Sequence, residues 1–258
     1  MKLYVFKINN VLKGIFLAVM AILLILVFYY SKEEIITVFQ QKRDLPIYSV
    51  DCSDKKIAIT FDCAWGSDDI PDILETLEKH QVTATFFIVG TWAEKFPEAV
   101  KLISEAGHDV ANHSYSHIKM ASVDKNRIKD EILKCDMVLE KITGKKVNLF
   151  RPPYGEYNND VVRGARELNH YTIQWDVDSL DWKPGITIEE IRNRINKNVK
   201  NGSILLFHND TVHTANIISD IIVNLKKDGY SFVPVSELII KDNYYIDNTG
   251  RQIKKEKS

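Results

Sequence analysis

The sequence predicts an α/β fold with a mainly parallel sheet, built from about seven βα units and preceded by one N-terminal transmembrane helix. Two observations predict it. From about Lys55 onward, short apolar runs rich in β-branched and aromatic residues alternate with longer amphipathic segments, which is typical of repeated βα units. Upstream, an uncharged apolar run stands apart from a composition that is 27% charged. The 258 residues are enough for one domain with a single large core.

The N-terminal segment is the strongest compositional outlier. Gly14 to Tyr30 is an uncharged run of 17 residues, near the minimum length for crossing a bilayer and longer than a typical signal-peptide core. No A-x-A-like cleavage site follows it, which favours an uncleaved signal anchor. Lysines precede the run and a segment of mixed charge follows it. We therefore expect residues 1–13 in the cytoplasm, a span at 14–30, and the rest of the chain outside the cell membrane.

The remaining segments divide by their patterning. Residues 31–54 hold few sustained patterns and are expected to form a linker. Residues 55–240 carry the βα alternation and form the expected domain, and residues 241–258 are expected to be a solvated C-terminal tail.

The period of the apolar residues assigns the elements of the domain. The expected strands are 56–61, 83–89, 109–112, 148–151, 171–176, 203–208 and 231–235. The expected helices are 69–79, 96–106, 125–142, 159–168, 188–199 and 215–227. A closed or nearly closed barrel and an open doubly wound sheet both produce this pattern, and both place functional residues at the carboxyl ends of the strands.

Charge and cysteine usage exclude some classes of function. The formal net charge of −1 provides no field to attract nucleic acid, so no nucleic-acid partner is expected. The three cysteines are an odd number without C-x-x-C spacing, which predicts neither a disulfide framework nor a zinc knuckle.

Polar clusters follow five of the expected strands. Asp62 ends the first strand as a candidate base, with a helix-capping role as its alternative. His113 and His117 follow the third strand at a spacing that places both imidazoles on one face if the segment is helical, within reach of one metal ion. Taken alone, that pair is more simply explained as two surface histidines.

The other three clusters suit positioning and acid chemistry. Arg151-Pro-Pro-Tyr154-Gly closes the fourth strand, where the arginine is able to hold a carboxylate ionised and the main-chain N–H of Tyr154 is able to face an oxyanion. A turn with a solvated arginine is the alternative. Asp178 follows the fifth strand and His208 ends the sixth, and the histidine is a good general acid if Asp178 raises its pKa.

Together these clusters resemble one family. From about Lys55 to Ile240, T-F-D, H-S-x-x-H, R-P-P-Y-G, D-x-x-D-W and L-x-H match in order the five motifs of the polysaccharide deacetylases, also called the NodB homology domain or carbohydrate esterase family four. The T-F-D-C-A-W-G run and the N-terminal anchor are most similar to the PdaB-type sporulation members. The resemblance implies a distorted (β/α) barrel.

The resemblance also implies catalytic roles. By it, Asp62 is the general base, Arg151 its partner, His208 the general acid, and Asp178 the carboxylate that tunes the acid.

A metal site and a substrate pocket are implied in the same way. His113 and His117 would hold a divalent metal, commonly zinc, while Trp182 and Leu206 would line the pocket for the acetyl methyl group. The chain departs from the family at Cys63, where a second, metal-binding aspartate is usual. A thiolate is a good zinc ligand, so Cys63 would complete the set if its sulfur points inward.

The resulting hypothesis is a hydrolase that removes N-acetyl groups from an amino-sugar polymer such as peptidoglycan, in sporulation or cell-wall maturation. Its alternative is a glycan-binding or structural protein of spore formation that keeps the fold and has lost turnover through Cys63. A third hypothesis is an ester deacetylase acting on xylan or a similar polymer.

Overall fold

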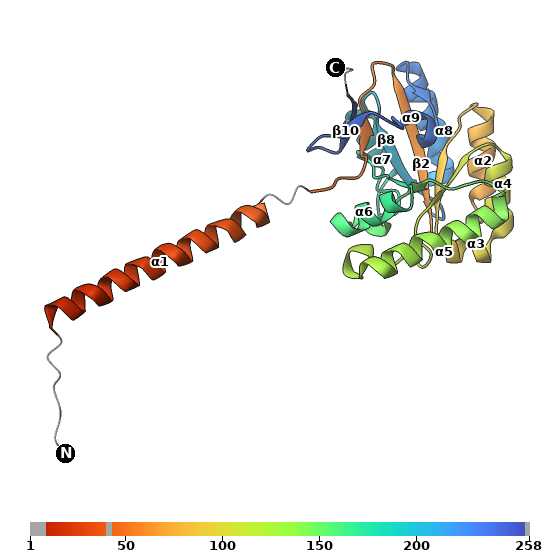
Figure 1. Ribbon diagram of the computed structural model, residues 1–258. Coiled ribbons are helices and arrows are strands. Elements are labelled where there is room, and N and C mark those ends of the chain that lie inside the picture. The colour runs from red at the N-terminus through yellow and green to blue at the C-terminus, as the bar shows by residue number, and fades with distance from the viewer. Residues whose placement is uncertain (1–8, 40–42, 256–258) are drawn as a thin grey trace. The chain divides into compact units, whose positions relative to one another are not determined.

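The computed structural model describes residues 9–39 and 43–255 (Figure 1). The chain divides into an N-terminal unit that ends at Arg43 and a folded unit that begins at Asp44. Each is described by itself.

The N-terminal unit contains one long helix, α1 (Asn10–Phe39). Within it, Leu12–Tyr30 has a mean hydropathy of 2.6 over 19 residues, long and apolar enough to cross a membrane. The expected span at 14–30 therefore lies inside one continuous helix, and that helix extends into the segment expected to be a linker. Of the expected cytoplasmic segment, residues 1–8 lie outside the described part of the chain.

The folded unit contains short strands. In chain order they are β1 (Ser49–Val50), β2 (Lys56–Cys63), β3 (Thr85–Ile88), β4 (Asp109–Asn112), β5 (Leu149–Phe150), β6 (Tyr171–Thr172), β7 (Val177–Asp178), β8 (Ile204–His208), β9 (Ser231–Phe232), β10 (Tyr244–Ile246) and β11 (Arg251–Lys254). The expected fifth strand, 171–176, is shorter in the structure, because pairing with β5 stops at Thr172 and a separate strand, β7, follows.

The main sheet is a curled half-barrel. Its strand order is β6-β5-β4-β3-β2-β8-β7, with β9 also paired to β2, and every pairing in it is parallel. The order follows the chain from β2 to β6, and β8 then returns to lie beside β2. An open doubly wound sheet would reverse its order in the middle, so the barrel alternative is confirmed.

The sheet is open between its edge strands β6 and β7, and a segment near β1 crosses this gap. Ile47 forms a parallel bridge with Ile173 on one side, and Ser49 forms an antiparallel bridge with Ser203 on the other. Part of the expected linker thus belongs to the fold, since main-chain groups at an open sheet edge gain partners there.

Helices cover the outer face of the sheet (Figure 1). They are α2 (Ile70–Lys79), α3 (Gly90–Lys95), α4 (Pro97–Glu105), α5 (Lys125–Thr143), α6 (Asn159–Glu167), α7 (Ile188–Asn198) and α8 (Thr214–Lys227), with 3-10 turns at η1 (Met120–Ser122) and η2 (Pro153–Gly155). The short helix α9 (Val235–Leu238) instead packs on the inner face, against Ala58 and Phe87. The six expected helices match α2 and α4 to α8 within a few residues. Asp124 caps α5 by accepting the N–H groups of Asn126 and Arg127, and Gly144 ends it at a φ of 69°.

The segment after residue 240 differs from the solvated extension expected there. Strands β10 and β11 form an antiparallel hairpin, and β11 also pairs in parallel with β1. The fully buried Gln252 side chain exchanges hydrogen bonds with the main chain of Ile240. Main-chain pairing with β1 orders this part of the chain, and the local pattern of apolar and polar residues does not predict that pairing.

Candidate active site

Asp62 and His208 mark the centre of the site. They are registered partners at the carboxyl ends of β2 and β8, two neighbouring strands inside the curled sheet. Alternation along β2 places Ala58, Thr60 and Asp62 toward the inside of the half-barrel, and Ile57, Ile59 and Phe61 toward the helices. The carboxylate and the imidazole therefore meet at one edge of the sheet.

Asp62 is a buried carboxylate with a cationic partner. Its Oδ1 lies 2.6 Å from Nη1 of Arg151, and its Oδ2 lies 3.4 Å from Nε2 of His113. Burial raises the pKa of Asp62, but the charge and hydrogen bond of Arg151, with the charge of His208, outweigh it and hold the pKa below its ordinary value. Asp62 is therefore ionised at neutral pH, as a general base must be.

Arg151 reaches Asp62 from the end of β5 and is fully buried. Nη1 also donates to Thr60 Oγ1 at 2.9 Å, and Nη2 donates to the carbonyl of Gln174 at 3.1 Å. The guanidinium carbon lies 3.9 Å from the centre of the Phe87 ring. Arg151 is thus paired with Asp62, as expected. Its hydrogen bonds and its contact with the Phe87 ring fix the position of the guanidinium group.

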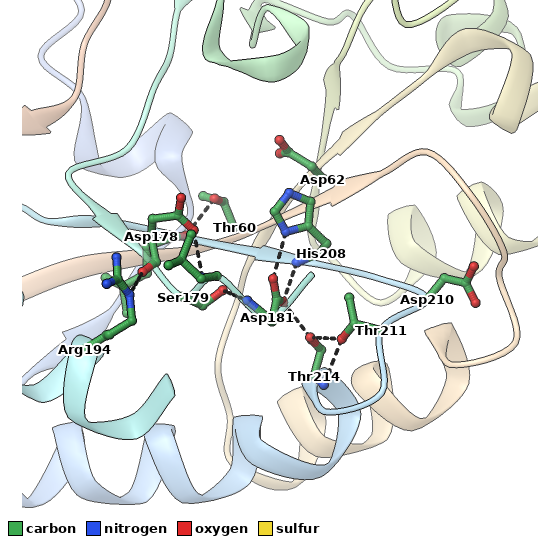
Figure 2. Close-up of polar contacts among 12 residues, drawn as sticks. Thr60, Asp62, Asp178, Ser179, Asp181, Arg194, His208, Asp210, Thr211 and Thr214 are labelled. Atoms are coloured by element: carbon green, nitrogen blue, oxygen red, sulfur yellow. Dashed lines mark hydrogen bonds and ion pairs between the residues drawn. The ribbon is translucent and has the colours of Figure 1, made fainter. Parts of the chain in front are cut away.

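His208 is held by Asp181. The two are joined by Nδ1 and Oδ1 at 2.8 Å, while Asp181 Oδ2 accepts the main-chain N–H of His208 at 2.8 Å and the hydroxyl of Thr214 at 2.5 Å (Figure 2). Burial lowers the pKa of His208, but the hydrogen bond and charge of Asp181 outweigh it, with smaller help from Asp62 and Asp178, so that the pKa is raised. The imidazolium is thereby favoured, as a general acid requires.

Asp178, the residue expected to tune His208, lies apart from the imidazole (Figure 2). Its Oδ1 accepts the main-chain N–H of Leu180 at 2.8 Å. Leu180 has a φ of 58°, and this turn brings the next aspartate, Asp181, back under the ring. The hydrogen bond to His208 therefore belongs to Asp181, the second aspartate of D-x-x-D-W, and Asp178 raises the pKa of His208 only through its charge.

His113 and His117 meet through a turn, whereas a helix was the condition set for their spacing. Both Ser114 and His117 have positive φ, at 64° and 54°. Ser114 Oγ accepts the N–H of His117 at 3.0 Å, and the fully buried Glu131 accepts both the N–H and the hydroxyl of Ser116 at 2.8 and 2.7 Å. The two ring centres lie 5.1 Å apart, so the turn brings the imidazoles together.

Both imidazoles are neutral. Nδ1 of His113 donates to the carbonyl of Arg151 at 2.8 Å, because a carbonyl only accepts, and this leaves Nε2 with a free lone pair. Burial is the main cause that lowers the pKa of His117 to about 4. Burial also lowers the pKa of His113, although Asp62 opposes it. Neutral rings with one nitrogen fixed are the form in which histidine binds metals.

Cys63 does not join these histidines. It is fully buried, and its side chain belongs to the apolar cluster that packs against the helices with Ile59, Phe61 and Trp92. Strand alternation is the reason, because Asp62 points inward and its neighbour must point outward. Burial, then the charges of Asp62 and Asp69, raise the pKa of the thiol well above its ordinary value. A protonated thiol is a poor metal ligand, so the expectation for Cys63 is corrected.

The donor set therefore does not fit the three-ligand metal site that the resemblance implied. Across residues 9–39 and 43–255, no group of three or more histidine, cysteine, aspartate or glutamate side chains is arranged to hold a metal ion.

A groove of about 410 Å³ opens beside His208. Trp182, which is 56% exposed, lines it, while Leu206 is buried on β8 two residues before His208 and shares its face. Tyr154 is equally exposed at 56%, and its ring centre lies 4.6 Å from that of His117. All three expected substrate-binding residues thus lie around the catalytic pair.

Several residues at the site were not expected. Asp181 accepts a hydrogen bond from His208 and another from Thr214. Thr60 accepts a hydrogen bond from Arg151, and Glu131 accepts one from Ser116 in the turn between His113 and His117. Of these, Asp181 carried a readable signal, because it is the second aspartate of its motif.

Comparison with known proteins agrees with this arrangement. A family model described as polysaccharide deacetylase matches residues 49–173. A peptidoglycan-N-acetylglucosamine deacetylase of Bacillus cereus is 36% identical over 187 residues, covering 71% of this chain and 68% of its own. The peptidoglycan-N-acetylmuramic acid deacetylase PdaA of Bacillus subtilis is 32% identical over 199 residues, covering 75% of each chain.

Among solved structures, a carbohydrate esterase family four pseudoenzyme from Bacillus anthracis is similar with a TM-score of 0.73. It is 35% identical, and the match covers 76% of this chain and 69% of that one. A mutant of it described as having restored enzymatic activity is similar with the same TM-score of 0.73 and 36% identity. The match in that case covers 76% of this chain and 71% of the other.

Proposed function

Because the chain belongs to the polysaccharide deacetylase family, we propose that it is a hydrolase that removes N-acetyl groups from an amino-sugar polymer, peptidoglycan being the preferred substrate. The observation that carries the proposal is the facing pair at the ends of β2 and β8. Asp62 is held ionised by Arg151, and Asp181 raises the pKa of His208, which favours its imidazolium. A binding protein has no physical need for a base and an acid tuned in opposite directions.

In this proposal Asp62 takes a proton from the attacking water. Burial excludes bulk solvent from the carboxylate, and the bond from Arg151 fixes which oxygen remains free for the water. His208 then gives its proton to the departing amine nitrogen, while Asp181 stabilises the imidazolium before the transfer. The main-chain N–H of Tyr154 is proposed to face the oxyanion, and Trp182 and Leu206 to contact the acetyl methyl group.

Acetate release from an N-acetylated glycan tests the proposal. Replacing Asp62 with Asn keeps the shape of the side chain and removes the base, and we expect a loss of roughly 10²- to 10⁴-fold in rate. An Asp62→Asn variant that releases acetate as fast as the parent would rule out the proposal.

A second candidate function is glycan binding without turnover, as expected for a structural protein of spore formation. Cys63 is the observation that favours it, because the usual third metal ligand is replaced by a thiol turned away from His113 and His117. The similarity to a structure described as a pseudoenzyme supports the same candidate. Glycan binding with no acetate release, with or without added zinc, would select it over hydrolysis.

The setting of either function is proposed as the outer side of a cell membrane. The apolar span Leu12–Tyr30 supports an anchor, and the lysines before it favour a cytoplasmic N-terminus. The role in sporulation or wall maturation is proposed from the resemblance of T-F-D-C-A-W-G alone. Fractionation of cells together with protease accessibility of the folded unit tests the location.

A further inference from the structure

Trp65 is a large apolar side chain held in water beside the catalytic pair. It lies in the loop between β2 and α2 and is 67% exposed. Its ring centre lies 6.0 Å from that of His117, with the planes at 70°. It also lines the same groove as Trp182 and His208. An isolated exposed tryptophan needs no explanation, but two that line one groove with a catalytic group do.

The main chain beside Trp65 is tied down by the loop after β8. The N–H of Gly66 donates to Asp210 Oδ2 at 2.9 Å, and the carbonyl of Gly66 accepts Nδ2 of Asn209 at 2.5 Å and Nε1 of Trp92 at 2.9 Å. A Cβ on residue 66 would lie 2.7 Å from Asp210 Cγ, so a side chain there would push the Asp210 carboxylate out of this contact. The loop that carries Trp65 is thereby fixed to the loop that follows His208.

A pre-formed aromatic face is suited to binding. A rigid side chain loses little conformational entropy when a ligand covers it, so burying its apolar area translates into affinity. A pyranose ring presents an apolar face of C–H groups and a polar rim of hydroxyl groups. The groove offers a matching set, with indole faces from Trp65 and Trp182 and polar atoms from His208 and the exposed Asp210.

We propose that Trp65 is the stacking platform for a sugar ring of the bound glycan, next to the residue that is deacetylated. This inference rests on the proposed glycan substrate and adds a specificity-determining residue to it. Trp65 positions the chain through its ring face, and no proton or electron moves through it.

Binding of a chito-oligosaccharide tests the proposal without requiring turnover. The full-length protein is kept in a polyoxyethylene ether detergent, because sugar-based detergents would compete for the groove, and its dissociation constant is measured by calorimetry. We expect Trp65→Ala to weaken binding roughly tenfold, the equivalent of about 1.4 kcal/mol. Trp65→Phe should recover much of the loss, because an aromatic face remains.

A matched control is available in the hairpin. Tyr245 is 47% exposed and absent from the groove, so Tyr245→Ala should leave the dissociation constant unchanged. The ligand-induced change in tryptophan fluorescence should shrink in Trp65→Phe, and the melting temperature should match that of the parent, because the side chain is mostly in solvent.

Several results would overturn the inference. One is Trp65→Ala binding the oligosaccharide as the parent does, another is a parent without measurable binding, and a third is equal weakening by Tyr245→Ala. Loss of phospholipid-vesicle binding in Trp65→Ala, with oligosaccharide binding intact, would assign the residue to a membrane surface. If the protein binds the oligosaccharide through Trp65 but releases no acetate, the inference about Trp65 stands and the proposed hydrolysis is wrong.

Discussion

His208 and Asp181 are joined by a hydrogen bond of 2.8 Å between Nδ1 and Oδ1, and the same carboxylate accepts the main-chain N–H of His208. One aspartate therefore fixes both the ring and the backbone of the histidine that faces Asp62 across β2 and β8. Asp181 is itself buried, with the hydroxyl of Thr214 on its second oxygen. This relationship makes Asp181 the residue on which the acid depends.

Asp181→Asn should lower the pKa of His208. Asp181 is the main group that raises this pKa above its ordinary 6.5, so the imidazolium would lose its proton at lower pH. The alkaline limb of the pH–rate profile should move to lower pH, and an NMR titration of the His208 ring should show the same shift without turnover. Asp178→Asn is the control and should shift the titration less, because Asp178 makes no hydrogen bond to His208 and acts only through its charge.

His208 also contributes to the stability of the folded unit, over a definite pH range. Because the folded-state pKa of His208 is raised, its contribution is fully present below the unfolded value and is lost as the pH rises through the folded value. A parent protein whose stability advantage over Asp181→Asn grows as the pH rises through this window would contradict the assignment.

Arg151→Met should destabilise the folded unit strongly. The substitution removes the cation that is hydrogen-bonded to the buried Asp62, and breaking a buried pair in this way costs about 3–5 kcal/mol. Urea unfolding at neutral pH measures the loss. The pair formed by Arg192 and Asp220 is the control, since both are partly exposed and Arg192→Met should cost less than about 1 kcal/mol.

The pH dependence of the Arg151 pair has the opposite sign to that of His208. Since the folded pKa of Asp62 is lowered from its ordinary 3.8, its contribution is present above the unfolded value and is lost as the pH falls through the folded value. Equal destabilisation by Arg151→Met and Arg192→Met at neutral pH would refute the buried pairing.

Cys63→Ser should leave zinc affinity unchanged. The sulfur lies in the apolar cluster behind the sheet, with its pKa raised by burial, so it contributes nothing to the face that carries His113 and His117. Zinc titration of the parent and of the variant measures this, with the buried Cys135→Ser as control. A drop of tenfold or more in Cys63→Ser alone would show that the sulfur turns inward.

Thiol labelling tests the same placement independently. In the folded protein, Cys63 and Cys135 are buried and protonated, whereas Cys52 is partly exposed. A thiol reagent should label only Cys52 before denaturation and all three cysteines afterwards. Rapid labelling of Cys63 in the folded state would contradict its burial.

Glu131→Gln should loosen the histidine turn. The carboxylate is fully buried and accepts from both polar groups of Ser116 and from Arg127 at 2.6 Å. The amide of Gln has the same shape, but its NH₂ group cannot accept a hydrogen bond. At least one of these three donors therefore loses its acceptor, which costs about 1–3 kcal/mol of stability. Urea unfolding measures the cost, and Glu140→Gln, which affects a surface pair with Lys146, is the weaker control.

The sequence by itself determined the class of fold and most of the site. Alternation of apolar runs located the helices and strands, and the motifs at the strand ends predicted which side chains would meet. This succeeded because the carboxyl ends of parallel strands share one edge of a sheet. Asp62, His208 and Arg151, separated by up to 146 residues, were therefore predictable neighbours.

Tertiary structure alone decided the direction of individual side chains near those ends. The turn at Leu180 selects Asp181 over Asp178, and the pleat of β2 turns Cys63 away from the histidines. Pairing of β11 with β1 likewise orders a segment with no pattern of its own. The physical reason is common to all three. A motif fixes the kind of group at a position, whereas its direction depends on one dihedral or one register step set by contacts distant in sequence.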